Sequence, residues 1–156
     1  MTGTAAAVSR WFAIDQARID RFAAVTEDAQ WIHTDPARAA ADGPFGSTVA
    51  HGFLTLSMMS AMAYDALPAT PGRISINYGF ERVRFVSPVP AGARVRAHFA
   101  LLSTTATAGS EPSHSETIHY DVTVEIEGVS KPALVARWIC RHTALEHPPP
   151  EPQRST

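Results

Sequence analysis

The sequence predicts an α+β domain in which an antiparallel sheet curls around one long, apolar helix. Residues 49–67 are apolar on nearly every side, and a helix of that kind must be buried on nearly every side. After Gly72, apolar and polar residues alternate with a period of two, which is typical of antiparallel strands with one solvated face. The sheet can cover such a helix only by curling around it.

The N-terminal part of the chain is expected to contain a loose arm followed by a short helix. Residues 1–10 are mostly small or polar and predict the arm. Asp15 is a candidate N-cap, because Ile19, Phe22 and Ala23 follow at the i, i+3, i+4 spacing of an amphipathic helix.

A second short helix is predicted to begin at Asp35-Pro36, an N-cap residue followed by a proline at the first helical position. Gly43-Pro44 must end this alanine-rich segment. The long apolar helix follows and is closed by Pro68 and Pro71-Gly72.

Four strands are predicted in the second half of the chain. Gly79 interrupts the first of them and indicates a β-bulge or a close backbone approach. The predicted strands span residues 74–86, 94–101, 117–126 and 133–142.

Length and composition predict a single domain over residues 11–146, followed by a disordered, proline-rich tail at 147–156. The loop at residues 104–115 is rich in Thr, Ser and Gly and is expected to be mobile. A single curled sheet leaves open edges and an uncovered helix flank. We therefore expect a homodimer.

Charge and apolar patterning exclude several classes of partner. The net charge of −2 gives no basic excess for nucleic acid. The longest apolar stretch, residues 53–67, is shorter than a bilayer span, and the N-terminus lacks a signal-peptide pattern. We therefore expect no membrane span and a cytoplasmic protein. The single cysteine, Cys140, lies in a predicted strand and is expected to be a buried, inert thiol.

One stretch of sequence carries chemistry: Phe22, then Asp28, Gln30 and His33, and further on the triplet Ala50-His51-Gly52. This arrangement resembles the MaoC-like (R)-specific enoyl-CoA hydratases, in the branch typified by the nodulation protein NodN. That family has an aromatic residue, a Gly-Asp pair, an Asn or Gln two residues on, and a His five residues after the Asp.

The resemblance implies a hot-dog fold and the reversible, (R)-specific hydration of trans-2-enoyl-CoA to (R)-3-hydroxyacyl-CoA, with no cofactor and no metal. It implies that Asp28 and His33 are the catalytic pair. Backbone at Gly52 would bind the thioester oxygen. Gln30, Ser60 and Asn77 would complete the substrate-binding site. The substrate would be an acyl-CoA, with an acyl-carrier-protein thioester left open.

Residue chemistry agrees with a water-activating pair. On a regular helix, residues five apart are rotated by about 140°, so Asp28 and His33 can converge only if the chain between them is irregular. A carboxylate and an imidazole holding one water can remove a proton and return one. Without the surrounding motif, Asp28 is better explained as a turn residue and His33 as a packing histidine; the motif reverses that preference.

The chain departs from the family pattern at Glu27, which replaces the glycine before the aspartate, and at Trp31, which replaces the proline before the histidine. Trp31 fits the NodN-like branch. Glu27 places a second carboxylate beside Asp28, which would raise the pKa of Asp28 if the two side chains approached.

Other features leave alternatives open. Several arginines could bind the phosphates of CoA, although solvated strand faces explain most of them. Met58, Met59 and Met62 could line an acyl tunnel, but core filling explains them as well. The arginines are Arg73, Arg82, Arg84, Arg94 and Arg96.

Two other functions remain open for this fold. A hot-dog thioesterase would need an acidic residue in the central helix, where Asp65 at its far end is the only candidate. A catalytically silent protein that binds acyl thioesters is the second alternative, suggested by Glu27.

Overall fold

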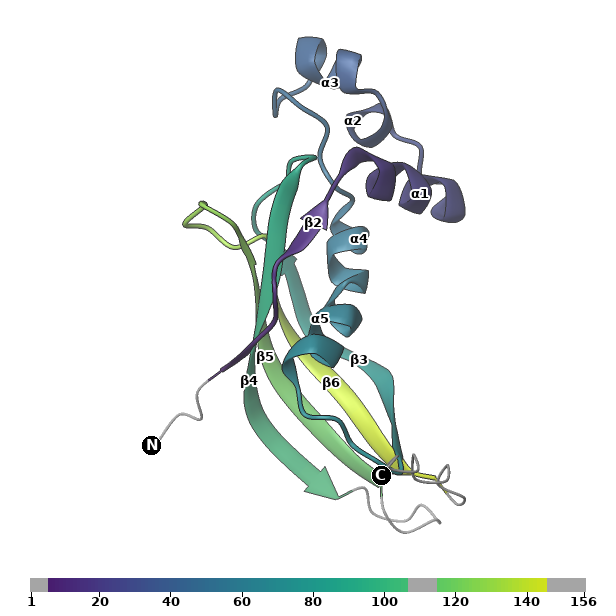
Figure 1. Ribbon diagram of the computed structural model, residues 1–156, viewed down its shortest axis with the longest axis vertical. Coiled ribbons are helices and arrows are strands. Elements are labelled where there is room, and N and C mark those ends of the chain that lie inside the picture. Colours follow the sequence, from purple (N-terminus) through teal and green to yellow (C-terminus); the bar gives the residue numbers. More distant parts are fainter. Residues whose placement is uncertain (1–5, 107–114, 146–156) are drawn as a thin grey trace, which may run out of the picture.

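The computed structural model describes residues 6–106 and 115–145. Within these ranges, short helices gather at one end of a long, twisted sheet, and a helical segment lies along one face of that sheet (Figure 1). The helices are α1 (Gln16–Thr26), α2 (Trp31–Thr34), α3 (Pro36–Asp42), α4 (Gly52–Ser57) and α5 (Met59–Ala66). The strands are β1 (Ala7–Val8), β2 (Phe12–Ile14), β3 (Arg73–Phe85), β4 (Ala93–Ala106), β5 (Ser115–Ile126) and β6 (Leu134–Ala144).

The described strands form one antiparallel sheet in the order β1-β4-β5-β6-β3, with β2 also paired to β4. The predicted antiparallel, curled sheet is therefore confirmed. Gly79 lies at a register shift between β3 and β6, so the bulge predicted there is confirmed too. The four predicted strands correspond to β3, β4, β5 and β6.

The N-terminal segment differs from the expected loose arm. Ala7 and Val8 form β1 and pair with His98 and Phe99 of β4. Ser9 is buried, and its hydroxyl accepts a hydrogen bond from the backbone N–H of Ala97 at 3.0 Å. The arm therefore does not extend over residues 7–9, because the unpaired edge of β4 offers their backbone hydrogen-bond partners. Residues 1–5 lie outside the described ranges.

Both predicted helix caps are present. The Asp15 side chain accepts from the N–H of Arg18 at 2.7 Å and begins α1. Asp35 accepts from the N–H of Arg38 at 3.0 Å and begins α3, with proline in its first turn. Each cap satisfies an N–H that has no partner within the helix.

The central apolar helix is divided into α4 and α5, which meet at Met58. Met58, Met59 and Met62 are at most 9% exposed and belong to the core between helix and sheet. The core-filling interpretation of these methionines is therefore confirmed.

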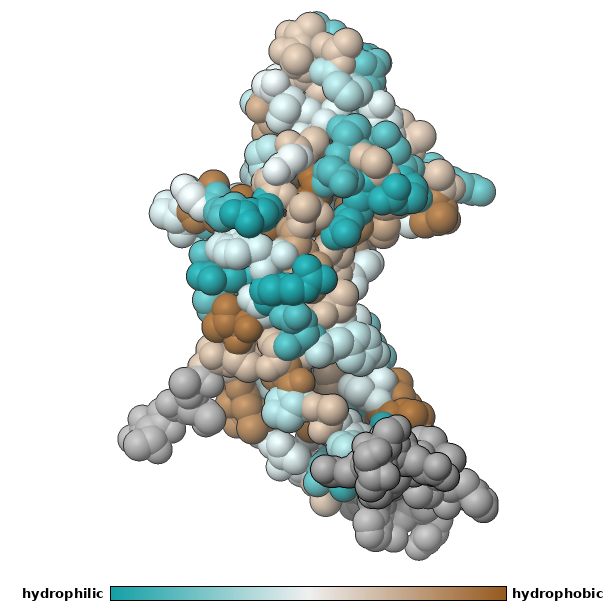
Figure 2. All heavy atoms as spheres, in the orientation of Figure 1, coloured by the Kyte–Doolittle hydropathy of each residue, from teal (hydrophilic) through white to brown (hydrophobic). Residues whose placement is uncertain are grey.

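Burial of the central helix is incomplete in a single chain. Phe53 is 66% exposed and Tyr64 is 79% exposed, so the expectation of burial on nearly every side is wrong for one chain alone. Figure 2 shows that separate apolar patches reach the surface among hydrophilic side chains in this view. The sheet covers one flank of the helix and leaves the other flank open.

The loop predicted at residues 104–115 is wrong at its ends: residues 104–106 belong to β4 and Ser115 begins β5, because the two strands continue to pair there. Residues 107–114 and the tail at 147–156 lie outside the described residues. No helix in the described part of the chain is both long enough and apolar enough to cross a membrane.

Candidate active site

His33 lies in the single turn of α2 and is only 8% exposed. Its Nδ1 lies 2.6 Å from the carbonyl oxygen of Val49. Because a carbonyl can only accept, Nδ1 must carry the proton, and in the neutral ring the lone pair is then on Nε2. Burial lowers the pKa of His33, against the opposing effect of the Val49 hydrogen bond. The site therefore favours a neutral imidazole with a free Nε2, which is the form of a general base.

A hydrogen-bonded scaffold fixes the backbone around His33. The Gln16 carboxamide donates from Nε2 to the His33 carbonyl oxygen at 2.7 Å, and its oxygen accepts from the Thr48 hydroxyl. The N–H of Val49 donates to the carbonyl of Ile32 at 3.1 Å. These bonds connect α1, α2 and the segment before α4, so that the imidazole is held from three parts of the chain.

Asp28 follows directly after the C-terminus of α1. Helix α1 ends at Thr26, and the backbone of the next residue, Glu27, is left-handed with φ 61°. This turns the chain so that residues 28–30 connect α1 to α2 without regular structure. The Asp28 side chain is 53% exposed. The irregular connection predicted between Asp28 and His33 is therefore present.

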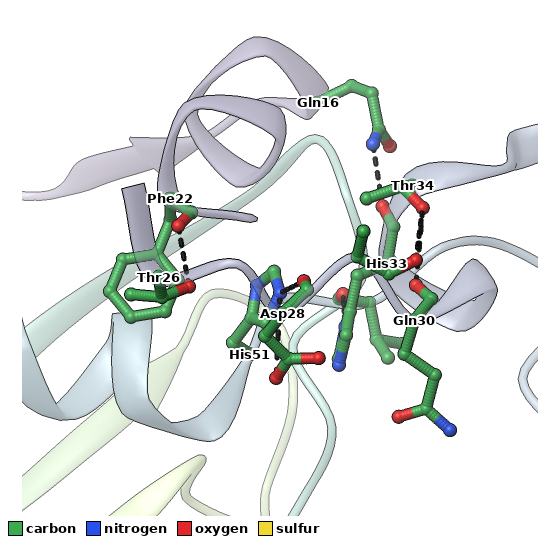
Figure 3. Close-up of polar contacts among 10 residues, drawn as sticks. Gln16, Phe22, Thr26, Asp28, Gln30, His33, Thr34 and His51 are labelled. Atoms are coloured by element: carbon green, nitrogen blue, oxygen red, sulfur yellow. Dashed lines mark hydrogen bonds and ion pairs between the residues drawn. The ribbon is translucent and has the colours of Figure 1, made fainter. Parts of the chain in front are cut away.

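The structure brings Asp28 and His33 together. One side-chain atom each from Asp28, His33 and His51 lies within 4.8 Å of the others. In Figure 3 the Asp28 carboxylate, the distal ring nitrogen of His33 and the Gln30 carboxamide point in the same direction. The Gln30 side chain does not cap α2. A carboxylate and an imidazole therefore lie close enough to share one water molecule.

His51 is the third member of this cluster, and it has no role in the site predicted from the sequence. It is 2% exposed, and its Nε2 lies 2.9 Å from the carbonyl oxygen of Asp28. Its ring stacks on His33 with centroids 3.8 Å apart, and Phe22 packs near it at 5.0 Å. The sequence offered one signal for His51, its position in the Ala50-His51-Gly52 triplet. The prediction from that triplet concerned only Gly52.

Gly52 is the first residue of α4, so its N–H has no partner within the helix. It lines a pocket of about 250 Å³ together with Phe85, Val86, Pro88 and other residues. A Cβ at position 52 would lie 3.0 Å from the Phe85 ring. A larger residue at position 52 would therefore push the Phe85 ring aside, and glycine leaves room for that ring beside the backbone.

The pocket at Gly52 does not include Asp28 or His33 in its lining. His51 lies between the two features, since it contacts His33 through its ring and precedes Gly52 in the chain. Within the described residues of one chain, the acid–base cluster and this pocket are neighbours but are not a single cavity.

Ser60 and Asn77 are not joined to the cluster by any contact among the described residues. Ser60 lies in α5, beyond the break at Met58, and does not line the Gly52 pocket. The Asn77 carboxamide oxygen accepts a hydrogen bond from Trp138 Nε1 at 2.8 Å and so ties β3 to β6. The contacts of Asn77 are those of a structural residue.

The cluster fits acid–base chemistry better than metal binding. An imidazole lone pair lies in the plane of its ring. The two rings are stacked with only 25° between their planes, so their lone pairs run side by side and do not converge on one ion. One nitrogen of each ring already contacts a backbone carbonyl.

Most of the arginines considered for phosphate binding pair with carboxylates. Arg96 on β4 donates to Glu125 on the neighbouring β5 at 2.9 Å, and Arg94 on β4 pairs with Glu127, just after the end of β5. Arg73 on β3 pairs with Glu116 on β5, across the intervening β6. These contacts are ion pairs on the surface of the sheet.

Cys140 is 2% exposed, and burial raises the pKa of its thiol to about 12. A thiol with so high a pKa carries almost no thiolate at neutral pH. The prediction of an inert thiol is therefore confirmed.

Comparison with known families and proteins agrees with this geometry. Residues 1–126 match the family model described as the MaoC like domain. The chain is 47% identical over 140 residues to nodulation protein N of Rhizobium meliloti, covering 89% of this chain and 84% of that protein. It is 45% identical over 138 residues to 3-hydroxyacyl-thioester dehydratase Z of Mycobacterium tuberculosis, covering 87% of each chain.

Solved structures show the same architecture. The (R)-hydratase from A. caviae involved in PHA biosynthesis superposes with a TM-score of 0.65 at 25% identity, covering 90% of this chain and 97% of that one. The MaoC-like dehydratase from Rhodospirillum rubrum superposes with a TM-score of 0.74 at 18% identity, covering 93% and 94%. The predicted hot-dog fold is confirmed.

Proposed function

Because the chain belongs to the MaoC-like domain family and is an enzyme of the hydratase and dehydratase type, we propose that it hydrates trans-2-enoyl-CoA thioesters reversibly to (R)-3-hydroxyacyl-CoA. The observation that carries this proposal is the approach of the Asp28 carboxylate to the His33 ring. The relative named as a 3-hydroxyacyl-thioester dehydratase supports the substrate class.

In the proposed reaction, one water lies between the Asp28 carboxylate and Nε2 of His33. The water loses a proton to His33 while its oxygen bonds to C3 of the enoyl group. The C2–C3 π electrons move toward the thioester and form an enolate, and the pair then returns a proton to C2. The net change is the addition of H and OH across one double bond, with no redox change and no cofactor.

Gly52 is proposed to stabilise the enolate. Its N–H at the start of α4 has no helical partner, and a thioester oxygen placed there would accept from it as negative charge develops. Absence of Cβ lets the carbonyl approach the backbone closely. Gln30 would orient the water. Ser60 and Asn77 do not contact the cluster within the described residues, and neither takes part in a step of the proposed reaction.

The thioesterase alternative is weakened by the contacts of Asp65. One carboxylate oxygen of Asp65 accepts from the backbone N–H of Arg10 at 2.6 Å, and the other lies 3.4 Å from the Arg10 guanidinium. Asp65 thus ties α5 to the N-terminal segment, and this structural contact explains its position at the far end of the helix.

The proposal is tested by the absorbance of the enoyl thioester band with crotonyl-CoA and longer enoyl-CoA substrates. We expect loss of absorbance without release of free thiol, and reduction of kcat by at least about a hundredfold in Asp28→Asn and in His33→Gln. His98→Gln is the matched control, since His98 lies on β4 and bonds Glu125. Thiol release would instead indicate a thioesterase, and tight binding without turnover a silent binding protein.

A further inference from the structure

We propose that His51 is a positioning residue that holds the acid–base pair in its working geometry: its Nε2–H anchors the backbone of Asp28, and its ring fixes the plane of His33. This inference rests on the proposed function, in which Asp28 and His33 share a water. His51 itself touches neither the water nor the substrate.

The contacts of His51 define its tautomer. Nε2 lies 2.9 Å from the Asp28 carbonyl oxygen, which can only accept, so Nε2 carries the proton. Nδ1 is buried and has no hydrogen-bond partner among the described residues. The hydrogen bond to Asp28 therefore requires a proton on Nε2 of His51.

The bond to Asp28 stabilises a segment that has no regular structure of its own. Residues 28–30 follow the left-handed Glu27. The hydroxyl of Thr34, the last residue of α2, is shared between the carbonyls of Ala29 and Gln30 at 3.2 and 3.3 Å. His51 comes from the start of α4 and holds the Asp28 carbonyl. It is the contact that ties the Asp28 backbone to the central helix.

The ring of His51 acts on the other member of the pair. It lies between Phe22 and His33, with centroid distances of 5.0 and 3.8 Å. The hydrogen bond from Nδ1 to Val49 restrains one edge of the His33 ring. It leaves the side chain some freedom to rotate about its own covalent bonds. A flat neighbour in stacking contact limits that rotation and keeps the distal ring nitrogen pointing the same way as the Asp28 carboxylate (Figure 3).

Only a histidine supplies both functions in this place. Phenylalanine keeps the flat ring but removes the donor to Asp28. Glutamine keeps a donor near the position of Nε2 but removes the ring. Among the described residues, the titratable side chain beside the two rings is that of Asp28, and the rings also face each other. Replacement of His51 therefore removes one titratable group from the surroundings of His33.

The first test is nitrogen-15 NMR of the histidine rings in the full-length protein, without substrate. At pH 8 we expect His51 to carry its proton on Nε2, hydrogen-bonded to the Asp28 carbonyl. In His51→Phe we expect the backbone amide signals of residues 28–30 to shift and broaden, because the hydrogen bond to Asp28 is lost. A proton on Nδ1 instead of Nε2 of His51 overturns the proposal, whatever the enzyme activity.

The second test compares kcat and KM for crotonyl-CoA in His51→Phe and His51→Gln. Misplacement of a reacting group by about 1 Å can cost about a hundredfold in rate. We expect a drop of that order in kcat for His51→Phe, a drop of about tenfold for His51→Gln, and KM within about threefold of wild type in both. The control is again His98→Gln, with kcat unchanged.

Circular dichroism and thermal unfolding separate positioning from folding. A purely structural His51 would lower Tm and the folded fraction, leave kcat per folded molecule unchanged, and so overturn the proposal. Should the wild type not turn over enoyl-CoA, the proposed function fails. The NMR measurements then still decide whether Nε2 of His51 donates to the Asp28 carbonyl.

Discussion

Glu27 is the residue at which the chain accepts a strained backbone beside the candidate active site. It is the single non-glycine residue with positive φ within the described ranges, at 61°, in the position where the family pattern has glycine. A left-handed conformation costs an L-residue about 1–2 kcal/mol. The departure from the family pattern therefore affects stability, and it leaves the direction of the chain into Asp28 intact.

Glu27→Gly is expected to stabilise the protein by roughly 0.5–1 kcal/mol, because relief of the left-handed strain exceeds the extra flexibility of glycine in the unfolded chain. Urea unfolding measures the difference. Glu27→Ala removes the same charge but keeps the strain, and it should leave stability within about 0.5 kcal/mol of wild type. Equal stabilisation by alanine and glycine would show that charge, and not backbone conformation, is responsible.

His33 should give the enzyme an acidic limb in its pH profile. The pKa of the imidazole is lowered, chiefly by burial, and a general base must be unprotonated. We expect kcat/KM to be maximal at neutral pH and to fall as pH drops below the ordinary imidazole pKa of about 6.5. Because the pKa of His33 is lower in the folded state, the folded protein binds fewer protons than the unfolded chain. The free energy of unfolding is therefore higher above the ordinary imidazole pKa and falls as the pH drops below it.

The pH-rate profile and urea unfolding at several pH values check both statements. In His33→Gln the dependence of stability on pH between about 7 and 5 should be weaker than in wild type. If the acidic limb lay at a pH above the ordinary imidazole pKa, it would contradict the assignment of this limb to His33, whose pKa is lowered by burial.

At the scale of elements, the short helices form because their ends are capped, and they bring the site residues into position. Helix α3 spans only seven residues, too few to be stable alone. Asp35 serves two helices: its side chain caps the N-terminus of α3, and its N–H donates to the carbonyl of Trp31, the first residue of α2, and so closes that turn. The turn that carries His33 thus depends on a cap located two residues later.

Asp35→Ala is expected to destabilise the protein by about 1 kcal/mol through loss of the cap, and to lower kcat modestly because α2 loosens. Thermal unfolding and crotonyl-CoA kinetics measure the two effects. The control is Asp42→Ala at the other end of α3, whose carboxylate is exposed and lies 3.9 Å from Arg38. A larger loss at position 42 than at 35 would contradict the capping explanation.

At the scale of the whole molecule, a single chain leaves the site open. The Asp28 carboxylate is 53% exposed, and the Gly52 pocket is separate from it. Phe53 is 66% exposed on α4, next to Gly52, and β3 is an edge strand with exposed Ile74 and Ile76. A second copy that covers these surfaces would exclude water and enclose the substrate, which supports the predicted homodimer.

Phe53→Asp is expected to shift the protein from dimer to monomer and to reduce kcat/KM by at least about tenfold, because a charge at an apolar interface is costly. Light scattering coupled to size exclusion measures the mass. Val129→Asp is the control, since Val129 is also half-exposed but lies after β5, away from α4. A monomeric wild type with full activity would contradict the dimer.

The sequence by itself determined the features that depend on neighbouring residues. Alternation predicted β3 to β6, Asp15 and Asp35 predicted two helix starts, and Gly79 predicted a bulge. The Asp28 and His33 pair was found through its motif, and the irregular link between them through helix geometry. These signals are local because periodicity and capping act over a few residues.

Only the tertiary structure decided which distant groups meet. The bond from His51 to Asp28 spans 23 residues, and the pairing of Ala7 with Phe99 joins the N-terminus to β4. The separation of the Gly52 pocket from the acid–base cluster is also a long-range result. Such contacts arise when packing brings buried polar groups together, and each group takes whichever partner lies within reach. No spacing along the chain encodes that choice.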